Sequence, residues 1–184
     1  MSTRDPGARD LGAIMGRLGP YLRQQAYVVT DLEAAKESMR TSFGCTRYFE
    51  FESTSPWEIN HSDGSSRTVQ CDLGLAFGRS GNVMIELMQP LRGEGVHFDH
   101  LARRGPGAHH HGYFVDDYDG LRAFAIEHGY PPVMSGVMSS SRFCYLDTVD
   151  EIGVYLELVH DPDGMVMKMM PWWDDRRPIA GTET

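Results

Sequence analysis

The feature that most constrains this chain is an internal repeat. One copy begins with Gln24 and the other with His110, and in each copy this polar residue opens a short apolar run. An aspartate follows seven positions later, Asp31 in the first copy and Asp117 in the second, so the two copies keep the same spacing. This pattern predicts a strand and then a helix with the aspartate as its N-cap, because a carboxylate accepts hydrogen bonds from the free N–H groups of a first helical turn.

Three segments typical of strands follow each predicted helix. We expect the first helix to end at Gly44 and the second at Gly129, since glycine adopts the left-handed conformation that terminates many helices. The strand-like segments are residues 47–52, 68–77 and 82–88 in the first copy and residues 133–138, 142–147 and 154–160 in the second. Each copy is therefore a βαβββ module, and the sequence predicts an α+β fold.

The repeat also suggests how the chain is divided. A single module of this size buries little surface, so we expect the two modules to share one core. The predicted parts are an N-terminal arm (1–21), a first module (22–90), a connecting loop (91–107), a second module (108–160) and a C-terminal tail (161–184). The arm carries an apolar helical stripe that we expect to pack on the domain or on a partner subunit, and the apolar, aromatic tail must pack as well.

The composition excludes several classes of partner. The chain has 17 Lys and Arg against 26 Asp and Glu, a net charge of −9, which suits neither nucleic acid nor an anionic membrane surface. We find no apolar stretch long enough for a membrane helix, no signal peptide, and no disulfide or zinc pattern among the three cysteines. We therefore expect a cytoplasmic protein that binds no nucleic acid and no membrane.

Four polar residues occupy equivalent places in the two modules. Because side chains alternate along a strand, Glu86 and Glu157 each fall in the middle of an apolar face, in the last strand of their module. Gln24 and His110 open the first strands, with small or apolar residues on the same face. A buried carboxylate is costly unless it is paired or binds a cation. Each residue taken singly could instead be partly exposed or salt-bridged, but together they predict one converging site.

The types of these side chains indicate a metal ion. One nitrogen ligand and several oxygen ligands are offered by Gln24, Glu86, His110 and Glu157. This set suits a hard or borderline divalent ion such as Co, Ni, Mn, Fe(II), Zn or Mg. Of the three consecutive histidines, strand alternation turns only alternate members to one side, and the register with Gln24 selects His110 rather than His109.

The segments that carry these residues resemble the vicinal oxygen chelate superfamily, which includes glyoxalase I, methylmalonyl-CoA epimerase, extradiol dioxygenases and bleomycin-resistance proteins. The resemblance covers roughly residues 22–160 and is closest to the epimerase-like and glyoxalase-like branch. It rests on four segments, QQAYVVTDL from residue 24, IELMQP from residue 85, GAHHHGYFVDD from residue 107 and GVYLEL from residue 153.

This resemblance implies two βαβββ modules that form a cupped mixed sheet around one divalent metal ion. In the superfamily the ligands come from the first and last strand of each module, which in this chain are Gln24, Glu86, His110 and Glu157. Gln24 departs from the pattern, because histidine is the commonest residue there and a neutral amide oxygen is a weaker ligand. With one histidine in register, the set also lacks the two-histidine, one-carboxylate triad of an extradiol dioxygenase.

The resemblance also implies a reaction class. We expect a metal-dependent isomerase, epimerase or lyase that stabilises the enolate of a small molecule chelated through adjacent oxygens, with Glu157 or Glu86 moving the proton. The alternatives are a non-catalytic small-molecule binding protein of the resistance type and an extradiol-type dioxygenase.

Other residues are candidates for the substrate pocket and for assembly. The candidate substrate-binding residues are Trp57, His61, Met84 and Tyr155. We assign Trp57 and His61 to a polar loop, residues 57–67, that is long enough to act as a lid. We expect a homodimer, because dimers are the commonest assembly and the arm and tail offer apolar surface.

Overall fold

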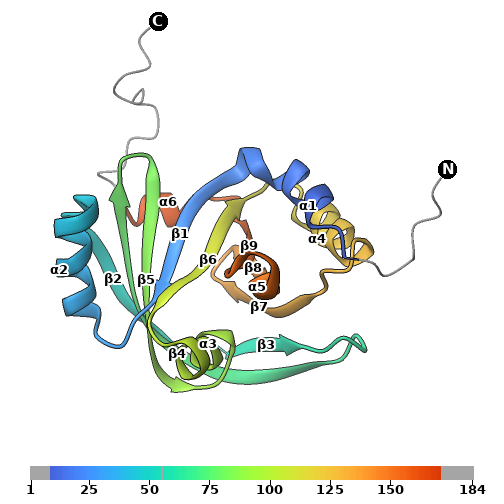
Figure 1. Cartoon of the computed structure of the whole chain (residues 1–184), viewed down its shortest axis with the longest axis horizontal. Helices are drawn as coiled ribbons and strands as arrows, with labels where there is room; N and C mark the ends of the chain where they lie inside the picture. The colour runs from blue at the N-terminus through green and yellow to red at the C-terminus, as the bar shows by residue number, and fades with distance from the viewer. Residues whose placement is uncertain (1–8, 55, 171–184) are drawn as a thin grey trace, which may run out of the picture.

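The computed structural model describes residues 9–54 and 56–170 (Figure 1). Ahead of the first module lie α1 (Leu11–Leu18) and a 3₁₀ turn (Gly19–Tyr21). The first module consists of β1 (Leu22–Val28), α2 (Leu32–Phe43), β2 (Tyr48–Ser53), β3 (Pro56–Asn60), β4 (Ser66–Ser80) and β5 (Val83–Gly93). The second consists of β6 (Gly107–Phe114), α4 (Tyr118–Glu127), β7 (Pro132–Met138), β8 (Ser141–Leu146), α5 (Val149–Ile152) and β9 (Tyr155–His160). Between the modules lies α3 (Val96–Arg104), and α6 (Met165–Lys168) follows the second.

All these strands belong to one mixed sheet that curves until its ends meet. The strand order is β2-β4-β3-β7-β8-β9-β6-β1-β5, and β5 also pairs with β4. In each module the first strand runs parallel to the last, β1 beside β5 and β6 beside β9. The modules join where β1 pairs antiparallel with β6, and again where β3 pairs with β7. Figure 1 shows the sheet wrapped around an interior, with α2 outside one wall and α1 and α4 outside the opposite wall. The predicted α+β fold is confirmed.

The predicted helix signals are present. Asp31 accepts a hydrogen bond from the N–H of Ala34, and Asp117 accepts one from the N–H of Gly120, both at 3.0 Å. The helix α2 ends at Gly44, which has a φ of 67°, a conformation that costs glycine little. Local sequence signals therefore mark the starts of α2 and α4 and the end of α2.

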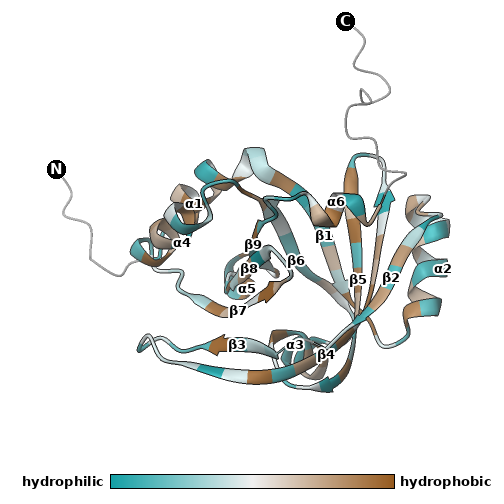
Figure 2. Cartoon of the chain, turned by 180° about the vertical axis from the view of Figure 1, so that it is seen from behind, coloured by the Kyte–Doolittle hydropathy of each residue, from teal (hydrophilic) through white to brown (hydrophobic). Residues whose placement is uncertain are grey.

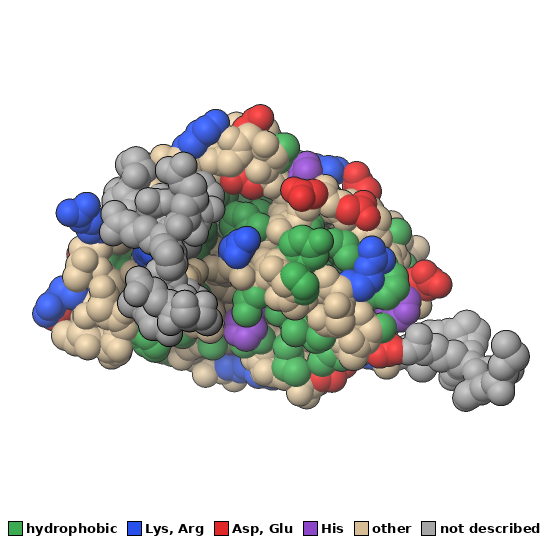
Figure 3. Space-filling view, turned by 90° about the horizontal axis from the view of Figure 1, so that it is seen from above, with side chains coloured by type: hydrophobic (Ala, Val, Ile, Leu, Met, Phe, Trp, Pro, Cys, Tyr) green, Lys and Arg blue, Asp and Glu red, His purple; other side chains and the backbone are tan. Residues whose placement is uncertain are grey.

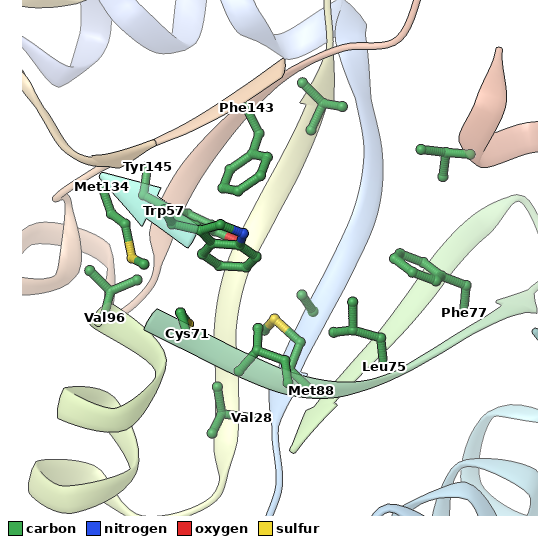
Figure 4. Packing of buried hydrophobic residues seen from close by; sticks show 14 of the residues in the cluster. Val28, Trp57, Cys71, Leu75, Phe77, Met88, Val96, Met134, Phe143 and Tyr145 are labelled. Carbon is green, nitrogen blue, oxygen red and sulfur yellow. The ribbon is translucent and has the colours of Figure 1, made fainter. Parts of the chain in front are cut away.

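Buried apolar residues form three clusters, one inside the curved sheet and two under the helices. The inner cluster includes Trp57, Phe77 and Met134 (Figure 4). Outside the second module, α1 and α4 pack on β8 and β9 through residues that include Ile14 and Leu121. The helix α2 covers the third cluster and presents alternating hydrophobic and hydrophilic bands (Figure 2). The apolar stripe of the arm thus packs on the domain.

Two segments differ from the sequence-based expectation. The polar loop predicted at residues 57–67 is instead the hairpin of β3 and β4, in which Trp57 points into the core. The connecting loop contains the helix α3, which buries His97 and His100. Polar residues suggested a loop in the first segment and Gly and Pro in the second, although Trp57 of β3 and His97 and His100 of α3 are buried.

The tail packs in part. Val166 of α6 and Met170 join the inner cluster, while the tryptophans at positions 172 and 173 lie outside the described residues. Within the described ranges, we find no helix with the length and apolar character required to span a bilayer.

Candidate functional site

Gln24, Glu86, His110 and Glu157 meet inside the curved sheet, and we call them the polar cluster. They come from β1, β5, β6 and β9, which are neighbours in the order β9-β6-β1-β5. The register aligns them, because Ala26 pairs with both Glu86 and His110. None of the four is more than 7% exposed. The structure therefore brings all four predicted residues together.

The contacts within the polar cluster leave two buried atoms without hydrogen-bond partners. Gln24 donates from Nε2 to Oε2 of Glu86 at 2.9 Å. Nε2 of His110 lies 3.2 Å from Oε2 of Glu86 and 3.2 Å from Oε2 of Glu157, which are ion-pair distances. Neither Nε2 of His110 nor Oε1 of Gln24 has a hydrogen-bond partner among the described residues. Buried polar atoms are nearly always satisfied, so these two atoms point to a ligand.

Gly112 provides the space that Gln24 occupies. It pairs with Gln24 on one side and with Glu157 on the other, so it lies at the centre of the polar cluster. A Cβ atom at this position would lie 2.2 Å from Oε1 of Gln24 and 2.9 Å from its Cβ. A larger residue would therefore displace the Gln24 side chain.

Burial and the neighbouring charges shift the pKa of His110, and that of Glu86, in opposite directions. Burial alone would lower the pKa of His110, but Glu157 and Glu86 outweigh it and raise that pKa to about 9. Burial raises the pKa of Glu86, and the nearby His110 opposes the shift. Tyr145 lies close by, and its pKa is raised well above its ordinary value by burial and by the two carboxylates. In the absence of an ion, one imidazolium thus faces two glutamates.

Part of the polar cluster borders a pocket. Gln24, Glu86 and Glu157 line it, and its volume of about 520 Å³ includes solvent space at its mouth. The rest of the lining is mainly apolar and comes from Trp57, Leu75, Phe77, Phe114, Met138, Ser141, Arg142, Phe143, Tyr145, Val159 and Val166. Figure 4 shows how several of these side chains, among them Trp57, Leu75, Phe77 and Phe143, face one another across the interior.

A comparison with protein families identifies the fold family. The family model described as the glyoxalase/bleomycin resistance protein/dioxygenase superfamily matches residues 23–145, more than half of the chain. The chain belongs to this superfamily. The resemblance found in the sequence is thereby confirmed. No curated protein matches the chain.

Solved structures share the fold of this superfamily member. Methylmalonyl-CoA epimerase from Mycobacterium tuberculosis aligns with a TM-score of 0.55 and 24% identity, covering 79% of this chain and 91% of that one. A hypothetical protein from Bacillus halodurans C-125 aligns with a TM-score of 0.55 and 17% identity, covering 76% and 93%. A variant of methylmalonyl-CoA epimerase from Streptomyces coelicolor, in complex with 2-nitronate-propionyl-CoA, has a TM-score of 0.50 and 24% identity, covering 78% and 95%. At these identities the likeness shows the fold.

The polar cluster of this superfamily member fits a divalent cation. Two carboxylates, one imidazole nitrogen and one amide oxygen make a donor set that such ions accept, and two of these atoms have no hydrogen-bond partner. Within the described residues, no three His, Cys, Asp or Glu side chains already stand as a cation-binding group. Nε2 of His110 contacts both glutamates, and a bound ion would replace this contact.

A β-bulge in β6 places a second histidine, His109, inside the curved sheet. Ala26 pairs with His110 but Tyr27 pairs with Ala108, so His109 is an extra residue on β6. His109 is 0% exposed, and its Nδ1 lies 3.0 Å from Nδ1 of His110. The expectation that alternation would turn His109 away from the interior is therefore wrong, because the bulge interrupts the period of two.

His109 belongs to a layer of neutral side chains behind the polar cluster. Its ring stacks on His97 of α3 with 4.7 Å between centroids, and Nε2 of His97 lies 3.3 Å from the hydroxyl of Tyr145. Burial lowers the pKa of both His97 and His109 well below the ordinary value. Nδ1 of His110 therefore faces His109, while Nε2 of His110 faces the two glutamates. The histidine triplet was the one sequence signal for this layer.

The four predicted substrate-binding residues lie in different parts of the structure. Trp57 lines the pocket, and its Nε1 is buried without a hydrogen-bond partner. Met84 packs in the inner cluster, and Tyr155 lies behind the pocket with its ring 5.0 Å from that of His109. His61 is exposed at the turn between β3 and β4, where its N–H donates to the carbonyl of Ser65. Of the four, only Trp57 is part of the pocket lining among the described residues.

Proposed function

We propose that this protein is a divalent-metal-dependent isomerase, epimerase or lyase that forms the enolate of a small molecule chelated through adjacent oxygens. The observation that carries the proposal is the convergence of Gln24, Glu86, His110 and Glu157, with two unsatisfied atoms, at an apolar pocket. Membership of the glyoxalase superfamily supports it, and so does the shared fold with methylmalonyl-CoA epimerase, whose reaction is an analogue of the proposed one.

The polar cluster would hold the ion. Its ligands would be Gln24, Glu86, His110 and Glu157, and candidate ions are Co, Ni, Mn, Fe(II), Zn and Mg. When bound, such an ion acts as a Lewis acid toward negative charge that develops on the substrate oxygens.

The two glutamates are placed to move the proton. Both line the pocket, so each can approach a carbon next to a substrate carbonyl. The hydrogen bond from Gln24 fixes the orientation of Glu86, and the contact with His110 holds Glu157. The chain's own chemistry is then removal of the α-proton by one carboxylate and its return to the same or a neighbouring atom.

The pocket walls contribute by keeping water away from the reacting atoms. Trp57 is held by edge contacts with Phe143, at 4.8 Å between ring centroids, and with His97, at 5.3 Å. Such a rigid apolar wall strengthens the electrostatic interactions of the polar cluster and limits loss of the abstracted proton to solvent.

Proton exchange tests this proposal. Incubation of the metal-loaded protein with 2-acyl-CoA esters and 2-oxo acids in deuterated water should give deuterium at the α-carbon of at least one substrate by NMR. A chelator should stop the exchange, and the added ion should restore it. Absence of ion-dependent exchange across the panel would contradict the proposal. Binding without exchange would favour the non-catalytic alternative, and oxygen uptake would favour the dioxygenase.

A further inference from the structure

We propose that the pocket selects substrates in which the group beyond the chelating oxygens is neutral and branched or aromatic, and that it rejects a second carboxylate at that place. This inference rests on the proposed function, because it takes the chelating oxygens to lie at the polar cluster. It concerns the walls of the pocket, which the polar cluster does not determine.

The walls are built from apolar side chains of several elements. Leu75 and Phe77 come from β4, Phe114 from β6, Phe143 from β8 and Val166 from α6. Phe77 is 4% exposed and Phe143 is 8% exposed, and both pack in the inner cluster, which fixes their positions. Figure 3 shows hydrophobic side chains gathered in a recess on the face seen from above. A substrate group in this pocket therefore meets aromatic rings and branched aliphatic chains.

The one basic residue in the described lining has its charge directed elsewhere. Arg142 neighbours Phe143 on β8, and adjacent residues of a strand face opposite sides of the sheet. Its guanidinium lies 4.6 Å from the ring centroid of Tyr118 and pairs with Asp119, with N–O distances of 3.2 and 3.3 Å. Tyr118 and Asp119 belong to α4, which packs on the outer side of the sheet.

The remaining charged groups of the lining are carboxylates. Glu86 and Glu157 both border the pocket, and Tyr145 beside them is neutral. A second carboxylate on the substrate would lose its hydration against phenylalanines and would meet no counter-charge from the described lining. It would also be repelled by the two glutamates. The same walls favour an apolar group, because its burial removes apolar surface from water.

Hydroxamates test binding at the polar cluster and binding to the pocket walls separately, because each compound carries the same pair of adjacent oxygens. Acetohydroxamate probes the polar cluster alone. 4-Methylpentanohydroxamate adds a branched apolar group, and succinic monohydroxamate replaces the two terminal methyl groups with carboxylate oxygens of similar shape. Calorimetric titration of the full-length protein, loaded with Co²⁺ and in a parallel series without ion, gives the affinity for each compound.

We expect 4-methylpentanohydroxamate to bind about tenfold more tightly than acetohydroxamate, and succinic monohydroxamate to bind no more tightly than acetohydroxamate. If the branched compound gains nothing over acetohydroxamate, or if the succinic compound binds as tightly as the branched one, the inference about the walls is wrong and the proposed function stands. If acetohydroxamate shows no ion-dependent binding, the proposed function itself fails and this inference fails with it.

Discussion

Replacing Gly112 with alanine should weaken the binding of a divalent ion about 10- to 100-fold, the effect typical of changes that misplace a metal ligand. The added methyl group would lie 2.2 Å from Oε1 of Gln24 and 2.9 Å from its Cβ. The amide could rotate away from the first clash, but the second involves an atom fixed to the backbone of β1. Gln24 must therefore leave its place beside Glu86, or β1 must separate from β6.

The same strand provides a matched control. A Cβ atom on Gly107 of β6 would meet no atom within 4 Å, so Gly107→Ala should bind the ion like the wild type. Calorimetric titration with Co²⁺ compares the two variants, and thermal unfolding checks that both are folded. Equal affinity of Gly112→Ala and wild type would show that the position of Gln24 does not matter for the site.

Substitution of the two glutamates should have the largest effect on turnover. We expect Glu86→Gln or Glu157→Gln to slow α-proton exchange by roughly 10²- to 10⁴-fold, the usual contribution of a general base. Glutamine keeps the size of the side chain and removes its ability to accept a proton. The loss should be largest for the glutamate that moves the proton.

The dependence on ion concentration separates the two possible roles of each glutamate. If a glutamate serves only as a ligand, excess ion should restore the exchange rate of its variant. If it carries the proton, the rate should stay low at saturating ion. Glu52→Gln, an exposed position on β2, is the control and should exchange at the wild-type rate. Wild-type rates in both cluster variants would exclude the glutamates as proton carriers.

The elements that follow a regular period could be predicted from the sequence. Asp31 and Asp117 fixed the starts of both covering helices, because N-cap chemistry is local. Glu86 and Glu157 were placed on inward faces by the period of two, and the repeat made their strands equivalent. Their convergence with Gln24 and His110 could be predicted because the repeat makes the first and last strands of the two modules equivalent. This prediction does not depend on the conformation of the loops.

Features that break a period could not be predicted in this way. The bulge at His109 depends on how β6 pairs with β1, a property of two distant segments. The strand β3 is short and half polar, and its pairing with β4 and β7 is what makes it a strand. The inward turn of His97 likewise depends on α3 lying against the sheet. The layer behind the polar cluster was therefore missed, while the cluster itself was found.

The most direct test of the account is a titration of the wild-type protein, without a histidine tag, with Co²⁺, followed by absorption spectroscopy. We predict saturable binding of one ion per chain, with a ligand-field spectrum that is lost in His110→Ala and retained in His61→Ala, whose histidine is exposed. Binding that does not saturate at one equivalent, or an unchanged spectrum in His110→Ala, would contradict the claim that the polar cluster is a metal site.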